Sequence, residues 1–256
     1  MCIALAALAL DAKVQARDLT LPEAESLLVR NNRELQAARR GMESADAQRV
    51  IAGARPNATF SVNASSINDA NTIEGQKRTA DTVLRIDQPF ERGNKRGLRL
   101  DAASGLQRAA RHDYLDVLRQ QVAVLQGAYF DLKLGQEKAR TLSENAQLFS
   151  GTLAAAQRRL QAGDLAPADV AKVQVDYERA QNDARTAQAE LARAQLALAY
   201  LLALDAEAPE LRATDPWPPL ERADAMAIQQ AIDARPDVAA ARARVEAAEK
   251  MRDLAR

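Results

Sequence analysis

Few residues in this sequence are of the kinds that build catalytic or metal sites. Its 256 residues include one histidine, His112, and one cysteine, Cys2. A single cysteine excludes a disulfide framework within the chain, and a single histidine excludes a zinc site built from several histidines. Carboxylates are numerous, but they are spread along helical segments and single out no acid–base pair. We therefore expect a protein that is not an enzyme, with no catalytic residues, no cofactor site and no metal site.

The sequence also lacks an excess of one charge, long apolar runs and aromatic residues. Lysine plus arginine and aspartate plus glutamate number 35 each, so nothing indicates a nucleic-acid partner. No segment beyond the N-terminus has 18 consecutive apolar residues, which excludes a transmembrane helix of the usual kind. Aromatic residues make up only 4% of the chain. This leaves little large side-chain volume to fill the core of a compact globule.

Alanine dominates what is present. Hydrophobic residues make up 47% of the chain, and they are largely alanine, which is the best helix former and permits helices to approach closely. Together with many glutamine, arginine, glutamate and leucine residues, this composition indicates long helices or coiled coils.

Residues 1–16 are similar to the remnant of a signal peptide. A short apolar run at 2–10 precedes Val14-Gln15-Ala16, which has the small-residue form of a cleavage site, although the usual basic segment is missing. The alternative is that this stretch begins a short helix. No lipobox precedes Cys2, and the sequence leaves its lipidation open.

Two segments with a period of two predict a β-hairpin. Apolar and polar residues alternate in NATFSVNASS (57–66) and in DTVLRIDQPF (81–90), with a polar loop at 67–80 between them. An isolated hairpin is only marginally stable in water, so we expect it to have partners. The ERGNKRG run that follows lacks the spacing of a phosphate-binding loop and is interpreted as a turn.

Helical periodicity dominates the rest of the chain. Thr20, Pro22 and Glu23 mark the start of a helix, and the pattern continues to about Ala54. Farther on, apolar residues recur at alternating spacings of three and four. This predicts two long helices, about 98–161 and 167–204, each with a heptad seam. The seam residues are Leu115, Leu118, Val122, Leu125, Tyr129 and Leu132, then, after a slip in register near Gly135, Ala139, Leu142, Ala146, Phe149, Leu153, Ala156 and Leu160, and in the second helix Val170, Val173, Tyr177, Ala180, Ala184, Ala187, Leu191, Ala194, Leu198 and Leu201.

Gly163 and Pro167 interrupt the helical pattern within QAGDLAPADV. Glycine takes the left-handed conformation that ends a helix, proline suits the first turn of the next one, and Asp169 favours a helix N-terminus. The two long helices are therefore predicted to fold back on each other as an antiparallel pair.

The end of the sequence repeats its beginning. Residues 237–255 match residues 34–52, with identities such as Ala37 with Ala240 and Arg39 with Arg242. We therefore predict a first helix–hairpin–helix–helix repeat over 17–222, which includes a proline-rich linker at 205–222 around Trp217, and the start of a second repeat over 223–256. On this interpretation the chain is truncated within the second repeat. The alternative is chance similarity between alanine-rich helices.

In this order the segments resemble the TolC-like outer-membrane efflux channel family. The resemblance runs from about Leu19 onward and rests on ELQAAR, QPFERGNKRG, AYFDL, AGDLAPADV followed by DYERAQND, and RPDVAAARARVEAAE. The ERGNKR run at 91–96 is similar to the branch that serves heavy-metal cation pumps. The resemblance implies a mainly α fold with a β-hairpin in a homotrimer of the outer membrane. Each full protomer supplies four strands to a shared twelve-stranded β-barrel, and long coiled-coil α-hairpins form a periplasmic α-barrel.

The resemblance also implies roles for the hairpin and for the helical turn. In a membrane barrel, the apolar face of the hairpin meets lipid and the polar face lines the aqueous lumen. The lipid-facing residues would be Phe60, Val62, Leu84 and Ile86, and the lumen-facing residues would be Ser61, Asn63, Arg85 and Asp87. Gly163, Leu165 and Asp169 match the family's tip motif, which contacts a periplasmic adaptor protein, whereas Pro167 replaces a residue that is often a small hydroxyl residue in the family.

We therefore expect the outer-membrane channel subunit of a tripartite efflux system. It would be a passive exit duct for substrates that an inner-membrane pump delivers through a periplasmic adaptor. The alternative is a periplasmic coiled-coil adaptor or structural protein. The strand pair favours the channel, because adaptors carry a lipoyl-like module and a β-barrel domain beside their coiled coil.

Overall fold

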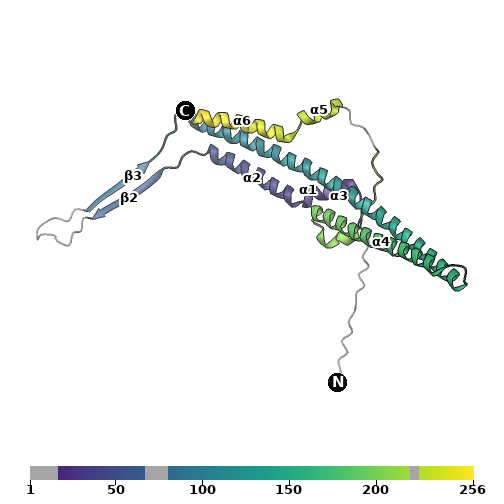
Figure 1. Cartoon of the computed structure of the whole chain (residues 1–256). Coiled ribbons are helices and arrows are strands. Elements are labelled where there is room, and N and C mark those ends of the chain that lie inside the picture. The colour runs from purple at the N-terminus through teal and green to yellow at the C-terminus, as the bar shows by residue number, and fades with distance from the viewer. Residues whose placement is uncertain (1–16, 67–79, 220–224) are drawn as a thin grey trace, which may run out of the picture. The chain divides into compact units, whose positions relative to one another are not determined.

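The computed structural model describes residues 17–66, 80–219 and 225–256 (Figure 1). The predicted signal-peptide remnant, with Cys2, and nearly all of the predicted strand-connecting loop lie outside the described residues. The chain divides into two compact units. The first combines residues up to Arg39 with Tyr114–Gln229, and the second combines Arg40–Asp113 with Gln230–Arg256.

Long helices dominate the structure, as the composition predicts. β1 pairs in parallel with β4, and β2 pairs in antiparallel with β3. Among the described residues, no helix combines the length and apolar character needed to cross a membrane. In chain order the elements are β1 (Arg17–Leu19), α1 (Leu21–Asn31), α2 (Arg33–Gly53), β2 (Thr59–Ser66), β3 (Ala80–Asp87), α3 (Lys95–Gln161), α4 (Pro167–Leu202), the 3₁₀ helix η1 (Asp205–Glu210), β4 (Leu211–Ala213), α5 (Ala225–Asp233) and α6 (Pro236–Leu254).

The first helix is broken at Asn32, whereas the periodicity predicts one helix to about Ala54. Asn32 is extended, with φ −61° and ψ 127°, and separates α1 from α2. Its Oδ1 accepts the backbone N–H groups of Glu34 and Leu35, each at 3.0 Å, and its Nδ2 donates to the Leu201 carbonyl of α4 at 3.0 Å. The side chain thus satisfies N–H groups that a helix start leaves without partners. The prediction of one helix is wrong because apolar periodicity does not register a capping asparagine.

The heptad seams are buried where α3 and α4 pack against each other in the first unit. Gly135 lies at the slip in register, and a Cβ there would come within 3.3 Å of the Leu191 Cα. Glycine therefore permits a close approach of the two helices at this level. Leu115 is predicted to lie in the buried seam, but 45% of its surface is exposed. The buried seam residues are Leu125, Tyr129, Leu132, Ala139 and Ala156 of α3 and Val170, Ala180, Ala184, Ala187 and Leu198 of α4.

Tyr129 lies at the centre of the core of the first unit. It is fully buried, and its hydroxyl is 2.8 Å from the Leu19 carbonyl and 3.0 Å from Oδ2 of Asp215. The same hydroxyl accepts the backbone N–H groups of Thr214 and Asp215 at 3.2 Å each, and burial raises the pKa of the Tyr129 phenol. Asp215 also accepts the N–H of Leu21 at 2.5 Å. Tyr129 therefore joins α3 to β1 and to the linker after β4, and Asp215 extends this network to the start of α1.

Trp217 fixes the proline-rich linker to α3. Its ring stacks on Phe130 at 5.8 Å between centroids, and its Nε1 donates to the Glu137 carboxylate at 3.1 Å. The Lys133 ammonium lies 5.7 Å from the indole ring. The prediction of an extended segment that packs one aromatic residue describes this part of the linker, but it missed η1 and the pairing of β4 with β1.

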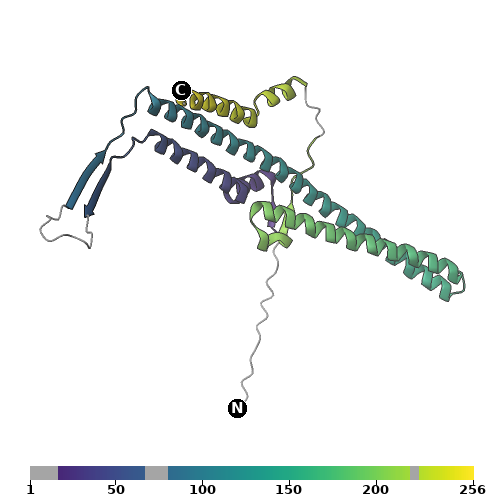
Figure 2. The ribbon, with the colours of Figure 1, turned by 60° about the vertical axis from the view of Figure 1, so that its left-hand side comes forward.

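In the second unit, α6 lies along the first part of α3 (Figures 1 and 2). A Cβ at Gly105 of α3 would come within 2.9 Å of the Ala247 Cβ of α6, so glycine is required for this contact. The α6 helix also forms two ion pairs with α3, one between Glu246 and Arg108 and one between Arg244 and Asp113.

The helix pair α1–α2 recurs as α5–α6 at the spacing seen in the sequence. The first pair begins at Leu21 and Arg33, and the second begins at Ala225 and Pro236. The division of the chain into two repeats at residue 222 stays a prediction.

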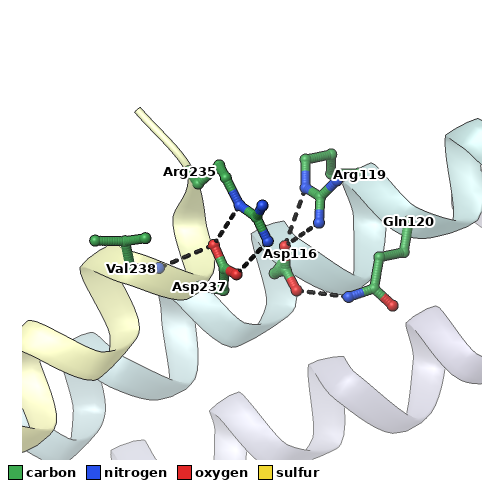
Figure 3. A network of polar contacts seen from close by, with 6 residues as sticks. All are labelled: Asp116, Arg119, Gln120, Arg235, Asp237 and Val238. Atoms are coloured by element: carbon green, nitrogen blue, oxygen red, sulfur yellow. Dashed lines mark hydrogen bonds and ion pairs between the residues drawn. The ribbon is translucent and has the colours of Figure 1, made fainter. Parts of the chain in front are cut away.

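The start of α6 is stabilised differently from the start of α2. Arg235 stands where the first pair has the capping asparagine, and it supplies no capping bond from its side chain. Instead, Oδ1 of Asp237 accepts the Val238 N–H at 2.9 Å, and the Asp237 carboxylate pairs with Arg235 at 2.6 Å (Figure 3). Within α3, a second carboxylate, that of Asp116, similarly accepts local bonds, from Arg119 and Gln120 (Figure 3).

Gly163 ends α3 in a left-handed turn with φ 82°. Its N–H donates to the Leu160 carbonyl at 3.0 Å, and the N–H of Asp164 donates to the Arg159 carbonyl at 2.9 Å. These two bonds define a Schellman motif, which satisfies carbonyls at the end of a helix. The sharp stop that the sequence predicts at Gly163 is thus a hydrogen-bonded turn.

Ala203 ends α4 in the same way, although it is not glycine. It has φ 54°, and the N–H groups of Ala203 and Leu204 donate to the carbonyls of Tyr200 and Ala199 at 3.3 and 2.9 Å. The left-handed conformation costs an L-residue about 1–2 kcal/mol. This helix end therefore carries strain that the end of α3 avoids.

Ala203→Gly should stabilise the first unit, and Gly163→Ala should destabilise the helical turn. We expect shifts of about 1 kcal/mol in opposite directions, because the strain at an L-residue is partly offset by the greater freedom of glycine in the unfolded chain. A Cβ at Gly163 would meet no atom within 4 Å, so this change isolates the backbone effect. Thermal unfolding followed by circular dichroism measures both variants. Shifts of the same sign would contradict the strain argument.

Candidate functional sites on the strand hairpin and the helical turn

The register of the β-hairpin brings the four predicted apolar residues onto one face. Phe60 lies opposite Ile86, and Val62 lies opposite Leu84. Cross-strand partners share a face of the sheet, so the two pairs form one continuous strip. All four side chains are more than half exposed, from 53% for Val62 to 73% for Ile86. An apolar strip of this kind indicates a surface that another apolar phase or partner covers.

The opposite face of the hairpin carries the predicted polar residues. Ser61 lies opposite Arg85, and Asn63 lies opposite Val83. The Nε of Arg85 pairs with the carboxylate of Asp87, two residues along the same face, at 2.7 Å. The hairpin is therefore amphipathic across its thickness, with an ion pair on the polar side.

Of the three predicted tip residues, Gly163 and Leu165 lie in the turn between α3 and α4, and Asp169 lies in the first turn of α4. Gly163 and Asp169 are exposed, and Leu165 is half-buried. Pro167 is the first residue of α4, and the preceding residue, Ala166, supplies no side-chain cap. Asp169 in the first turn of α4 instead places a negative charge near the helix N-terminus, which is favourable there, and pairs with a lysine one turn on at 3.1 Å.

The ERGNKRG run forms a structured junction, which the sequence predicts only as a turn. The Nε of Arg96 donates to the Gly53 carbonyl at 2.7 Å, and Arg99 donates to the Ala54 carbonyl at 3.3 Å, so two side chains of α3 bind carbonyls at the end of α2. Arg99 also forms a two-bond ion pair with Glu91. The hydrogen bond from Arg99 holds the pKa of the Glu91 carboxyl below its usual value. The sequence signal that was available is the spacing of the arginines, which places Arg96 and Arg99 on one helix face.

The part of the chain that the structure describes contains no group of three or more histidine, cysteine, aspartate or glutamate side chains that could hold a metal ion. The candidate sites described above are surfaces of the strand hairpin, the helical turn and the junction at Arg96.

Comparison with known proteins gives a family and several relatives. Residues 25–204 match the family described as outer membrane efflux protein. Over 186 residues, 73% of this chain, the sequence is 27% identical to the cobalt-zinc-cadmium resistance protein CzcC of Cupriavidus metallidurans. Over 72% of this chain it is 30% identical to the protein CyaE of Bordetella pertussis. The chain spans 43% and 39% of the lengths of these two relatives.

The fold is also found among solved structures. The CmeC outer membrane channel of Campylobacter jejuni superimposes with a TM-score of 0.76 at 18% sequence identity. The match covers 92% of this chain and 52% of that one. The mainly α fold with a strand hairpin and long helical hairpins, as predicted, is thereby confirmed as that of the TolC-like channels.

Proposed function

Because the chain belongs to the outer membrane efflux protein family, we propose that it is a channel subunit through which a tripartite system exports its cargo. Members of this family are channels of the outer membrane with periplasmic helical portions, and they are not enzymes. The family decides against the adaptor or structural protein that the sequence left open. The observation that carries the proposal is the amphipathic β2–β3 hairpin, whose exposed apolar strip would face lipid.

The hairpin needs further strands to form a channel. Two strands alone leave edges with unpaired backbone groups, which is unfavourable in lipid. We propose that three copies of the full protomer close the barrel, each with a second hairpin from the second repeat. The domain division at 17–222 and 223–256 is part of this proposal. The polar face with Ser61, Asn63, Arg85 and Asp87 would then line the lumen.

Transport through this channel requires no chemical step. The polar lumen offers a wet path across the outer membrane, and the packed α3–α4 hairpins would extend that path through the periplasm. The energy would come from an inner-membrane pump, and a periplasmic adaptor would join the pump to the channel. The protein itself then needs no cofactor.

The cargo that we propose is a heavy-metal cation. The relative CzcC is named for resistance to cobalt, zinc and cadmium, and the ERGNKR run resembles that branch. Deletion of the gene should lower the tolerated concentration of these metals in growth medium. Unchanged metal tolerance with reduced drug tolerance would assign another cargo.

Membrane fractionation tests the channel proposal directly. The protein should separate with outer-membrane porins, and it should migrate as a trimer when samples are not heated. Recovery in the soluble periplasmic fraction would refute the proposal.

Leu165→Asp should impair efflux while leaving the channel folded and in the outer membrane. Leu165 lies half-buried in the turn, so a carboxylate there would disturb an apolar contact with an adaptor and leave the helical seams intact. Growth in the presence of cargo and crosslinking to the adaptor measure the effect. We expect at least a tenfold loss of crosslinked adaptor, which corresponds to about 1.4 kcal/mol.

Ala166→Asp is the matched control for the turn. It adds the same charge one residue away, at the N-cap of α4, where aspartate is a preferred residue and should stabilise the helix by about 0.5–2 kcal/mol. Efflux should persist in this control. Equal adaptor crosslinking in Leu165→Asp and wild type would show that Leu165 is not part of the proposed contact.

A further inference from the structure

We propose that the junction between the strand hairpin and α3 binds the phosphate headgroup of an anionic phospholipid. The junction consists of residues 55–58, which precede β2, and residues 88–96, which follow β3 and enter α3. The inference rests on the proposed function, because a hairpin that spans the outer membrane brings its own base to the membrane–water interface. Nothing in the family match assigns a ligand to this place.

A cleft of about 860 Å³ lies at the junction. This volume is within the range of about 300–1,000 Å³ that is usual for small-molecule sites. The amide of Gln88 braces the cleft, since its Nε2 donates to the carbonyls of Pro56 and Pro89 at 3.2 Å each. The lining residues are Arg55, Pro56, Asn57, Ala58, Gln88, Pro89, Phe90, Glu91 and Arg96.

The charges at the cleft are predominantly positive. Arg55 and Arg96 line it and are exposed, and Arg92 and Lys95 are exposed residues of the segment 88–96 that borders it. Within residues 17–66, 80–219 and 225–256, neither Arg55 nor Arg92 nor Lys95 forms a salt bridge. The one carboxylate of the lining, Glu91, is already paired with Arg99. These cations therefore suit a ligand that brings its own negative charge.

The guanidinium of Arg96 is oriented for such a ligand. Its Nε is bound to the Gly53 carbonyl at 2.7 Å, which fixes the plane of the group beside the cleft. The two terminal nitrogens can then donate to two oxygens of one phosphate, the geometry that arginine favours.

Phe90 indicates that the phosphate belongs to a lipid. It lines the cleft and 85% of it is exposed, more than any other large apolar residue in the described part of the chain. Aromatic residues concentrate at the membrane–water interfaces of membrane proteins, including β-barrels. Cations beside an exposed aromatic ring match a headgroup with its acyl chains better than they match a free anion.

The charge test uses the full chain purified in detergent. Native mass spectrometry counts bound dioleoyl phosphatidylglycerol and dioleoyl phosphatidylcholine. Wild type should prefer the anionic lipid by at least about tenfold, since each cation near an anionic surface contributes up to about fivefold. The variant R55Q/R92Q/K95Q/R96Q should lose this preference. A control that neutralises four exposed cations of α3 and α4, R140Q/R158Q/R159Q/R193Q, should keep it.

Inorganic phosphate distinguishes the two sources of the ligand chemistry. At a tenfold excess over phosphatidylglycerol it should leave the bound lipid in place. Displacement of the lipid by phosphate would overturn the assignment to a lipid, and an unchanged lipid preference in the fourfold junction variant would overturn the site.

A second measurement does not depend on the fourfold variant folding. Phe90→Trp is made in a background in which Trp217, the one tryptophan of residues 1–256, and any tryptophan outside them are replaced by phenylalanine, so that the sole tryptophan lies at the junction. In reconstituted vesicles its fluorescence should be quenched more by lipids brominated near the headgroup than by lipids brominated deep in the acyl chain. Equal or deeper quenching would overturn the interfacial placement. Protein that never reaches the outer membrane would refute the proposed function, whereas inserted protein without these lipid effects would refute only this inference.

Discussion

Val62→Arg should deplete the protein from the outer membrane. Val62 lies near the middle of β2, opposite Leu84, in the exposed apolar strip. Arginine on the lipid face of a membrane barrel costs about 2–4 kcal/mol near the midplane. This corresponds to a loss of roughly 30- to 800-fold in the equilibrium between inserted and uninserted protein. Quantitative immunoblotting of separated membrane fractions measures the depletion.

Asn63→Arg is the matched control for the strand. It adds the same side chain at the next residue, where the pleat directs it to the opposite face, the side of Ser61 and Arg85. A lumen-facing arginine remains in water, so insertion should stay near the wild-type level. If the Val62 variant inserted and the Asn63 variant did not, the lipid-facing and lumen-facing sides of the hairpin would be the reverse of those proposed. Equal insertion of both variants would show that the hairpin does not lie in the membrane.

Tyr129→Ala should lower the free energy of unfolding of the first unit by about 3–5 kcal/mol, as expected when a large buried aromatic residue is truncated. Tyr129→Phe separates the hydroxyl from the ring. It removes the single O–H donor that the Leu19 carbonyl and the Asp215 carboxylate share, and it removes the acceptor of the Asp215 backbone N–H. The expected loss is about 1–3 kcal/mol, the cost of an unsatisfied buried polar group. Urea unfolding in detergent, followed by circular dichroism, measures both.

Tyr200→Phe is the control for this pair. Tyr200 is 63% exposed on α4, and its contact with the Arg33 guanidinium, at 5.7 Å, uses the ring that phenylalanine retains. Its stability should change little. A Tyr129→Phe variant as stable as Tyr200→Phe would show that the hydroxyl network contributes nothing to the fold.

Local pattern was enough to predict most of the elements. The predicted strands at 57–66 and 81–90 correspond to Thr59–Ser66 and Ala80–Asp87, and the long helices at about 98–161 and 167–204 correspond to Lys95–Gln161 and Pro167–Leu202. Periods of two and of three to four residues carry this information directly. The turn at Gly163 was predictable for the same reason, because its chemistry lies within five residues.

The missed features depend on contacts between residues far apart in the sequence. Asn32 breaks the first helix with the help of a carbonyl of α4. The short strand β1 exists because β4, nearly 200 residues later, pairs with it. The cleft at Arg96 forms only where α2 and β3 end and β2 begins beside it. The periodicity of one segment cannot predict contacts with partners that lie far away in the sequence. The roles of the lipid-facing, lumen-facing and tip residues remain predictions.

The alanine seam of α4 limits how this chain can change by mutation. Ala180, Ala184 and Ala187 are buried against α3, and only glycine is smaller. In most protein cores the frequent damaging change is a loss of volume, but here almost every substitution adds volume between two closely packed helices. Substitutions at these sites therefore almost always increase the side-chain volume. A larger residue can become fixed only after a facing residue on α3 has been replaced by a smaller one. The sequences of the two helices must therefore change together.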